Sequence, residues 1–389
     1  MSASRPRIGV VAPALPPIVG GAEAVAESLI RVLIGLGFLV DVVSGTEYAS
    51  IRDEITANDG RFVFVGRDVD GDVVPWEFDC FARSEALWRL NEEAQIDLWH
   101  VFSHDCAVAV AMCSPSVPVV GTFSEMSTEA DGAGRARSRF TYSLKCLTAV
   151  TASSDFYESV ALRHGFPASG VQRLMTGIDV HGLRHGDSER GRSLLGVSGN
   201  APVVLCPSRF SPRKGQLDLV EAVSRISNVR LDVILLGSSN SGSTTYLQSV
   251  RRRIEAKGLS QTIRVVDGVD RGDMPNVLAA ADLIVQPSYG EGLGLSALEA
   301  MAAGVPLAAT AVSGFDGFLR HEGNSLTSRP GDVEGLATNM LRLLRDEALS
   351  AQLTARGIVD AQEFGLERTA IEVMKLYGDL VPAWQGGLL

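Results

Sequence analysis

A glycine-rich turn between a short apolar strand and a helix is the stretch of this sequence best suited to chemistry. The apolar run at 282–287 is typical of a buried parallel strand, and the turn begins at Gly290. Strong helix formers follow from Leu295 to Ala303, and Gly304 with the proline after it ends the helix. The first N–H groups of such a helix have no partner within it and point into the turn. The sequence therefore predicts an anion site, because glycines let a phosphate approach the backbone closely.

Two carboxylates bracket this turn. Glu291 enters it, and Glu299 follows two helical turns later. A carboxylate beside an anion site is unfavourable unless it has a task, such as accepting hydrogen bonds from hydroxyl groups. A phosphate, hydroxyl groups and a sharp turn together indicate a nucleotide sugar as the ligand. The alternative is an ordinary strand–turn–helix unit with a surface glutamate, which any α/β protein can contain.

The string from Glu291 to Pro306, E-G-L-G-L-S-A-L-E-A-M-A-A-G-V-P, closely resembles a motif of the retaining glycosyltransferases of family 4, which have the GT-B fold. The resemblance implies that Glu299 accepts hydrogen bonds from ribose hydroxyls and that Glu291 holds hydroxyls of the transferred sugar. The backbone N–H groups that it places near the phosphate and the sugar belong to Gly292, Leu293, Gly294 and Leu295.

Two cations earlier in the chain match a second motif of that family. Arg209 and Lys214 stand five residues apart in R-F-S-P-R-K-G, after an apolar strand. A departing nucleoside diphosphate builds up negative charge, which a guanidinium and an ammonium group neutralise without metal. The resemblance thus makes Arg209, Lys214 and Glu291 the catalytic set, with a UDP- or GDP-sugar as donor, no tightly bound cofactor and no metal. The alternative is a basic surface turn.

The first half of the chain resembles the family more weakly. Its first loop carries P-P-I-V-G-G-A-E, in which Gly20 and Gly21 match glycines that touch the donor phosphates in the family. Ser124 stands where the family has a histidine near the reacting carbon of the sugar. A hydroxyl still donates or accepts a hydrogen bond but carries no positive charge. On the acceptor side of the site we place Ser124 and His104.

Three further patterns have structural explanations that we prefer. The run D-V-D-G-D at 68–72 lacks the glycine position and the later glutamate of a calcium loop, so we expect a tight Asp-Gly turn. His100 and His104 are four residues apart, but no third ligand is near, so we expect polar residues at a strand end rather than a metal site. The arginines at positions 135, 137 and 139 are expected on a solvated helix face, the alternative being an acceptor site.

The composition disfavours several classes of partner. The chain has 389 residues, a formal net charge of −11 and a sequence pI of about 5.1, which argues against nucleic acid and anionic membranes. It contains no apolar stretch of 18 residues and no signal peptide before the first strand, so we expect no stable membrane insertion and a cytoplasmic location. The five cysteines are scattered without a C-x-x-C pair, as is typical of reduced thiols.

The order of apolar runs and helix formers predicts an α/β protein, and its length predicts more than one domain. The resemblance implies the GT-B architecture, with two Rossmann-like, doubly wound domains facing across a cleft. We expect an acceptor-binding domain at 1–183, a nucleotide-sugar-binding domain at 184–365, and a helix at 366–389 that returns to the first domain. Local expectations are helices at 22–36, 332–346 and 347–378, a helix capped by Asp155, and a polar linker near 182–190.

The expected function is that of a retaining hexosyltransferase, which moves a hexosyl group from the nucleotide sugar to a hydroxyl group. The paired-carboxylate route of glycosidases fits poorly, because Glu291 and Glu299 are both committed to the donor. The helix at 22–36 carries only Arg31 against two glutamates, which disfavours a lipid surface. We therefore expect a soluble small-molecule acceptor, such as a cyclitol, an aminoglycoside or another intermediate of secondary metabolism.

Several alternatives stay open. The first is a transferase that acts on lipid or polysaccharide. The second is a nucleotide-sugar epimerase or a phosphorylase of the same architecture, against which the cation pair and the two glutamates count. The third is a catalytically silent binder of sugar nucleotides, conceivable because of Ser124. The sequence specifies neither the sugar, the base, the acceptor nor the oligomeric state.

Overall fold

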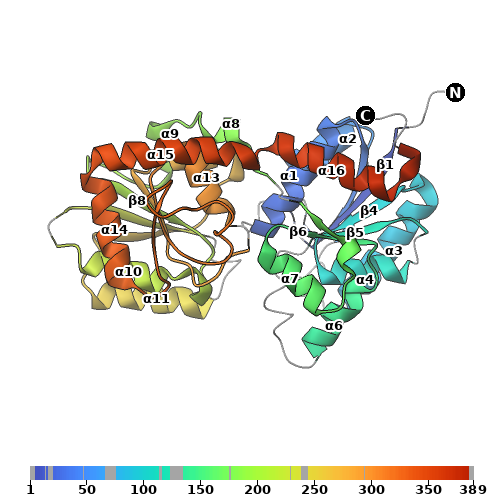
Figure 1. The fold of residues 1–389 in the computed structure, drawn as a ribbon, viewed down its shortest axis with the longest axis horizontal. Coiled ribbons are helices and arrows are strands. Elements are labelled where there is room, and N and C mark those ends of the chain that lie inside the picture. Colours follow the sequence, from blue (N-terminus) through green and yellow to red (C-terminus); the bar gives the residue numbers. More distant parts are fainter. Residues whose placement is uncertain are drawn as a thin grey trace. The chain divides into compact units, whose positions relative to one another are not determined.

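The computed structural model describes residues 5–13, 15, 21–46, 48–65, 76–113, 116–122, 135–174, 177–227, 229–237, 244–292 and 294–384. They form two compact units, each built on one parallel sheet (Figure 1). The first unit includes Gly21–Gly177 and Leu366–Leu389, and the second includes Ile178–Gly365. The predicted α/β class with two doubly wound sheets is confirmed.

The first unit contains a seven-stranded sheet in the order β3-β2-β1-β4-β5-β6-β7. Its strands are β1 Arg7–Ala12, β2 Leu39–Ser44, β3 Phe62–Phe64, β4 Leu98–Val101, β5 Val119–Thr122, β6 Ala149–Ala152 and β7 Val171–Arg173. Its longer helices are α1 Gly21–Gly35, α2 Ala49–Ala57, α3 Trp76–Ala94, α4 His104–Met112, α6 Arg135–Leu144, α7 Asp155–Arg163 and α16 Leu366–Leu380. The central strands are apolar and buried along almost their whole length, because helices cover both faces of a parallel sheet.

The second unit contains a six-stranded sheet in the order β10-β9-β8-β11-β12-β13. Its strands are β8 Val203–Pro207, β9 Asp232–Leu236, β10 Ile263–Val266, β11 Leu283–Gln286, β12 Leu307–Thr310 and β13 Leu326–Ser328. Its α-helices are α8 Val180–Leu183, α9 Ser188–Leu194, α10 Gln216–Ser224, α11 Thr244–Ala256, α12 Met274–Ala279, α13 Leu295–Ala303, α14 Val333–Arg345 and α15 Glu347–Ala361. Three short 3₁₀ helices complete it, at η2 Pro212–Lys214, η3 Arg271–Asp273 and η4 Gln362–Phe364.

The strand order of the second sheet reverses between β8 and β11. These two strands pair in parallel, with Leu283 beside Val204 and Ile284 beside Leu205. In doubly wound sheets, the loops that leave the carboxyl ends of two such strands run to opposite faces of the sheet and leave a crevice between them. Ligands of doubly wound sheets bind at such a point.

The polar, glycine-rich segment expected to be a linker near 182–190 is instead folded, so that prediction is wrong. Helices α8 and α9 cover most of it, and α9 packs against α12. A Cβ atom on Gly186 would lie 1.9 Å from the carbonyl oxygen of Pro275, and one on Gly191 would lie 1.9 Å from that of Asn276. These glycines permit close packing of the backbone, which composition alone does not distinguish from flexibility.

Two local boundaries also differ from prediction. The single helix expected at 347–378 is two helices, α15 and α16, because η4 and Gly365 interrupt it. Gly365 is extended and forms a bridge with Ile178 where the chain passes from the second unit to the first. The cap of α7 is Ser154 rather than Asp155, since the Ser154 hydroxyl accepts from the N–H of Tyr157.

Helix α16 packs beside α1 in the first unit (Figure 1). Buried polar side chains join it to the sheet. The Tyr377 hydroxyl lies 2.6 Å from Nδ1 of His100, and Nε2 of His100 lies 2.7 Å from Oγ1 of Thr122. His100 was expected to be a polar residue at a strand end, but it lies within β4 and is fully buried. Burial lowers the pKa of His100 to about 3, so the ring is neutral at ordinary pH.

A neutral imidazole has one donor and one acceptor, which orients this chain of hydrogen bonds. If the Tyr377 hydroxyl donates to Nδ1, then Nε2–H donates to Thr122, whose hydroxyl donates to Thr151. The opposite tautomer leaves the buried Tyr377 proton without an acceptor among the described residues, which is unfavourable. The first arrangement therefore links α16 to the carboxyl ends of β4, β5 and β6.

Candidate functional site

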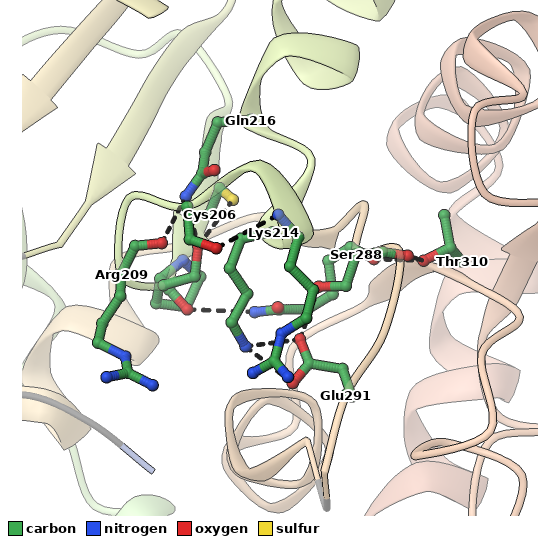
Figure 2. A network of polar contacts seen from close by, with 12 residues as sticks. Cys206, Arg209, Lys214, Gln216, Ser288, Glu291 and Thr310 are labelled. Carbon is green, nitrogen blue, oxygen red and sulfur yellow. Dashed lines mark hydrogen bonds and ion pairs between the residues drawn. The ribbon is translucent and has the colours of Figure 1, made fainter. Parts of the chain in front are cut away.

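A charged cluster joins the loops that follow β8 and β11 in the second unit (Figure 2). Nζ of Lys214 donates to both carboxylate oxygens of Glu291, at 2.7 Å to Oε1 and 2.8 Å to Oε2. The hydroxyl of Ser288 also donates to Oε1, at 2.6 Å. The side chain of Glu291 is 5% exposed and that of Lys214 is 17% exposed. The cluster is thus a largely buried ion pair at the point where the strand order reverses.

The loop that carries Lys214 is held against the end of β11 by a glycine. Gly215 has φ +66°, in the left-handed region that favours glycine. A Cβ atom at this position would lie 1.9 Å from the carbonyl oxygen of Pro287. Ser211 caps η2 in the same loop, because its hydroxyl accepts from the N–H of Arg213. The K-G pair in the sequence therefore combines a charged side chain with a site of close backbone approach.

Arg209 lies in the same loop, two residues beyond β8. Nε2 of the buried Gln216 donates to the carbonyl oxygen of Arg209 at 2.8 Å and to the Ser208 hydroxyl at 2.9 Å. Figure 2 shows the side chains of Arg209 and Lys214 extending from this loop in the same direction. Both predicted cations thus come from one anchored loop, although the described hydrogen bonds join only Lys214 to Glu291.

The glycine-rich turn leads into α13, which spans Leu295–Ala303 as predicted. Gly294 has φ +71° and provides no side-chain cap to the first N–H groups of the helix, although its carbonyl oxygen accepts from the N–H of Ala297. A Cβ atom on Gly294 would lie 2.2 Å from Cε1 of Phe315, and one on Gly314 would lie 2.4 Å from the carbonyl oxygen of Glu291. The segment at Gly314 and Phe315 therefore packs against the turn, a contact that the sequence did not indicate.

Glu299 lies in the second turn of α13 and is 3% exposed. Its Oε1 is 2.7 Å from a guanidinium nitrogen of Arg271, which lies in η3 beyond the end of β10. Sequence reasoning did not identify Arg271 or Ser288. The position of Ser288, just after a buried strand and three residues before Glu291, is a signal that could have found it. For Arg271 the sequence showed only its place in a loop after a strand, which does not indicate a role.

Each of the two glutamates thus pairs with a cation from another strand-end loop. Lys214 serves Glu291, and Arg271 serves Glu299. Such pairing offsets the electrostatic free energy of burying a carboxylate. A carboxylate accepts about four hydrogen bonds in all, so both acids keep capacity for hydroxyl groups of a ligand.

Other predicted site residues fall partly or wholly outside the described residues. Gly20, Ser124 and Leu293 lie outside them, as does the D-V-D-G-D run at 68–72. Gly21 begins α1, and a Cβ atom there would meet nothing within 4 Å. His104 begins α4, which Ser103 caps, and its side chain lies outside the described residues. Helix α6 begins at Arg135, and the side chains of its three arginines also lie outside the description.

The described residues contain no group of three or more His, Cys, Asp or Glu side chains placed to hold a metal ion. Cys106, Cys113, Cys146 and Cys206 are free thiols. Cys206 lies at the end of β8, beneath the cluster, and burial raises the pKa of its thiol to about 12. A protonated, enclosed thiol is a poor nucleophile.

Two family models match consecutive parts of the chain. The model described as "Glycosyltransferase Family 4" matches residues 19–181, and the one described as "Glycosyl transferases group 1" matches residues 187–359. The chain belongs to the group 1 glycosyltransferases. The family predicted from the motifs at Arg209 and Glu291 is thereby confirmed.

Curated relatives in this family include enzymes that act on inositol derivatives. The D-inositol 3-phosphate glycosyltransferase of a Nocardioides species is 28% identical over 221 residues, which cover 54% of this chain and 48% of that protein. A GDP-mannose-dependent monoacylated alpha-(1-6)-phosphatidylinositol monomannoside mannosyltransferase of Corynebacterium glutamicum is 33% identical over 196 residues, covering 48% of this chain and 50% of that one. The chain spans about half the length of the curated relatives that it matches.

Solved structures share the fold over nearly the whole chain. The Anabaena protein HepE in complex with UDP-glucose has a TM-score of 0.80 and 20% sequence identity, covering 96% of this chain and 100% of that one. Sucrose-phosphate synthase from Thermosynechococcus elongatus has a TM-score of 0.80 and 22% identity, covering 97% and 100%. These likenesses support the GT-B fold class. In the part of the chain that the structure describes, no helix has the length and apolar character needed to cross a membrane.

Proposed function

We propose that this group 1 glycosyltransferase moves a hexosyl group from a nucleoside diphosphate sugar to a hydroxyl group, with retention of the anomeric configuration. The observation that carries the proposal is the cluster of Lys214, Glu291 and Ser288 at the reversal point of the second sheet. In this cluster a cation suited to a diphosphate lies beside an acid suited to sugar hydroxyls. A site for a nucleotide sugar requires both groups.

In this proposal each charged group has one role. Arg209 and Lys214 stabilise the diphosphate as it leaves, together with the N–H groups at the start of α13. Glu291 accepts hydrogen bonds from hydroxyls of the sugar, and Glu299 accepts from hydroxyls of the ribose. Lys214 has three N–H donors and uses two on Glu291, so one remains for a phosphate oxygen.

The proposed chemical step is a displacement on one face of the sugar. The bond between the anomeric carbon and the phosphate oxygen breaks, and its electron pair stays on that oxygen. The leaving oxygen takes the proton of the acceptor hydroxyl, whose oxygen forms the new bond on the same face. The cations lower the barrier because negative charge on the diphosphate grows as the bond breaks.

For the acceptor we propose a soluble cyclitol or a similar small polyol. The names of both relatives described above contain inositol, one as its phosphate and one within a lipid. The chain is acidic, with a net charge of −11, which disfavours an anionic lipid surface as the location of the acceptor. A lipid-linked inositol is therefore the second arm of the test rather than the first choice.

The test begins with thermal unfolding in the presence of UDP-, GDP- and ADP-hexoses. A donor at one hundred times its Kd should add about 2.7 kcal/mol of stability. Release of the nucleoside diphosphate is then measured with myo-inositol, its 3-phosphate or phosphatidylinositol as acceptor, and NMR of the product gives the anomeric configuration. Lys214→Ala should lose most turnover, whereas Lys257→Ala, which removes a lysine paired with Glu221, should not. Absence of any stabilising nucleotide sugar would refute the function, and an inverted product would refute retention.

A further inference from the structure

Glu299 is a carboxylate in an apolar stretch of helix. Its helical neighbours Ala297, Leu298 and Ala300 are buried, and Glu299 itself is 3% exposed. Removing a charged carboxylate from water is unfavourable unless partners satisfy it. The identity and placement of those partners therefore determine how the carboxylate is oriented.

Arg271 is the partner that the structure provides. One of its guanidinium nitrogens lies 2.7 Å from Oε1 of Glu299, and its side chain is 29% exposed, so a partly exposed cation pairs with a buried acid. The two residues come from separate elements, η3 and α13. The pair is therefore a tertiary contact and not an incidental neighbour pair on one helix.

The loop that carries Arg271 is anchored on both sides. Oδ1 of Asp270 accepts from the N–H of Gly272 at 2.8 Å and caps η3. Oδ1 of Asp273 accepts from Nε of Arg190 at 2.8 Å and from Nδ2 of Asn276 at 3.0 Å. A loop fixed in this way holds the start of the Arg271 side chain in place.

The ion pair leaves Glu299 unsaturated. Although Arg271 is close to Oε1, that buried oxygen has no hydrogen bond of normal geometry among the described residues. The other acid differs, because Glu291 already accepts two hydrogen bonds from Lys214 and one from Ser288. An oriented carboxylate with an unused, buried acceptor atom is suited to a ligand that brings hydroxyl donors.

We infer that Arg271 is a positioning residue for nucleotide specificity: it orients the Glu299 carboxylate so that the acid reads the 2′- and 3′-hydroxyls of the donor ribose. This inference rests on the proposed function, in which Glu299 binds the ribose. Without Arg271 the Glu299 carboxylate is no longer held in one orientation. A nucleotide with both ribose hydroxyls then gains less binding free energy from its hydrogen bonds to Glu299. A nucleotide without these hydroxyls gains nothing from Glu299 in either case. Arg271 should therefore affect discrimination between the two nucleotides and leave binding of the diphosphate unchanged.

The experiment measures Kd by calorimetry for UDP, GDP and ADP and for their 2′,3′-dideoxy counterparts. The nucleotide that binds wild-type protein most tightly is then tested with Arg271→Ala, Arg271→Lys, Glu299→Gln and the double variant Arg271→Ala/Glu299→Gln. We expect Arg271→Ala to weaken the ribonucleotide about tenfold and the dideoxynucleotide less than twofold, a loss of discrimination of about five- to tenfold, or roughly 1.0–1.4 kcal/mol. Arg271→Lys should restore part of the discrimination, and the double variant should resemble Glu299→Gln alone.

Arg264→Ala is the matched control, since it removes a partly exposed arginine of the same unit from its ion pair with Asp232. It should bind both nucleotides like wild type. Equal weakening of both nucleotides by Arg271→Ala would overturn the inference, and so would wild-type discrimination in that variant. If Glu299→Gln retains full discrimination, the role of Glu299 is wrong and the inference falls with it. If no nucleoside diphosphate binds wild-type protein, the proposed function itself fails, a result distinct from the others.

Discussion

Nζ of Lys214 lies within 2.8 Å of both carboxylate oxygens of Glu291, although 77 positions separate these residues in the sequence. The pair joins the loop after β8 to the loop after β11, two neighbouring strands on either side of the reversal point. Because both side chains are largely buried, their charges interact more strongly than those of an exposed pair. The pair is therefore part of both the stability and the proposed chemistry of the second unit.

Removing one partner of this pair should destabilise the protein. Lys214→Ala leaves the Glu291 carboxylate buried beside a single hydroxyl donor, and we expect a loss of about 3 kcal/mol in the free energy of unfolding. The double variant Lys214→Ala/Glu291→Ala should recover part of this loss, because no buried charge remains. Urea unfolding of the wild-type protein, Lys214→Ala, Glu291→Ala and the double variant measures both effects. A double variant as unstable as the sum of its single variants would show that the two charges do not interact.

The hydroxyl of Ser288 should contribute to activity more modestly than the charges do. Ser288→Ala removes the 2.6 Å hydrogen bond to Oε1 of Glu291 and leaves Lys214 in place. We expect kcat/KM to fall about tenfold, the equivalent of roughly 1.4 kcal/mol. Steady-state kinetics with the preferred donor measure this change. Ser224→Ala, which removes a hydroxyl bonded to the Glu221 carbonyl oxygen, serves as a control that should leave kcat/KM unchanged.

Substitution of two glycines with nearly the same backbone conformation distinguishes the effect of backbone strain from that of steric overlap. Gly215 has φ +66° and Gly258 has φ +67°, but a Cβ atom would lie 1.9 Å from the Pro287 carbonyl oxygen at the first position and would meet nothing within 4 Å at the second. Gly258→Ala should therefore cost only about 1 kcal/mol of stability, from the left-handed conformation. Gly215→Ala must also push apart the loops after β8 and β11. Urea unfolding should show a loss at least twice as large, with weakened nucleotide binding, and equal losses would contradict the close approach.

The buried imidazole of His100 predicts a specific pH dependence of stability. Burial lowers its pKa from 6.5 to about 3, so between these values the unfolded chain binds a proton that the folded protein excludes. The stability that this proton exclusion contributes to the folded protein is fully present above pH 6.5 and is lost progressively as the pH falls toward 3. Between pH 7.5 and pH 5 this amounts to about 2 kcal/mol.

Urea unfolding at these two pH values should show that His100→Gln loses less stability on acidification than wild type does. His181→Gln, at an exposed position, is the control and should behave like wild type. NMR of the His100 ring in the wild-type protein gives a second measurement that does not depend on the variant folding. A ring that titrates between pH 6 and 7 would contradict the buried, neutral state.

Much of the second unit could be predicted from the sequence because its signals are local. Helix α13 starts and ends where helix formers and glycines indicate, and Lys214 and Glu291 each follow a strand of the second sheet, as their motifs indicate. Ser288 and Arg271 escaped prediction because their roles depend on tertiary contacts with Glu291 and Glu299. Spacing along the chain carries no information about such contacts.

The errors have the same physical origin. Gly186 and Gly191 look like linker residues, but they fit against carbonyl oxygens of α12. His100 looks like a strand-end polar residue, yet its second partner, Tyr377, comes from a helix 277 residues later. Composition indicates that a backbone is free to adopt many conformations or that a side chain is polar. Only the tertiary structure shows whether a glycine allows flexibility or close packing, and whether a polar side chain makes a buried hydrogen bond.

The return of α16 to the first unit also constrains how the protein is made. Tyr377 is buried beside Phe38 and His100, and the ring of Trp384 lies tilted against that of Phe38, with 5.6 Å between the ring centroids. When the first 177 residues have been synthesised, α16, which completes the first unit, has therefore not yet been made. Translation proceeds at roughly 5–20 residues per second, so the nascent first unit waits about ten seconds or more, while the whole second unit is synthesised, before it can be completed.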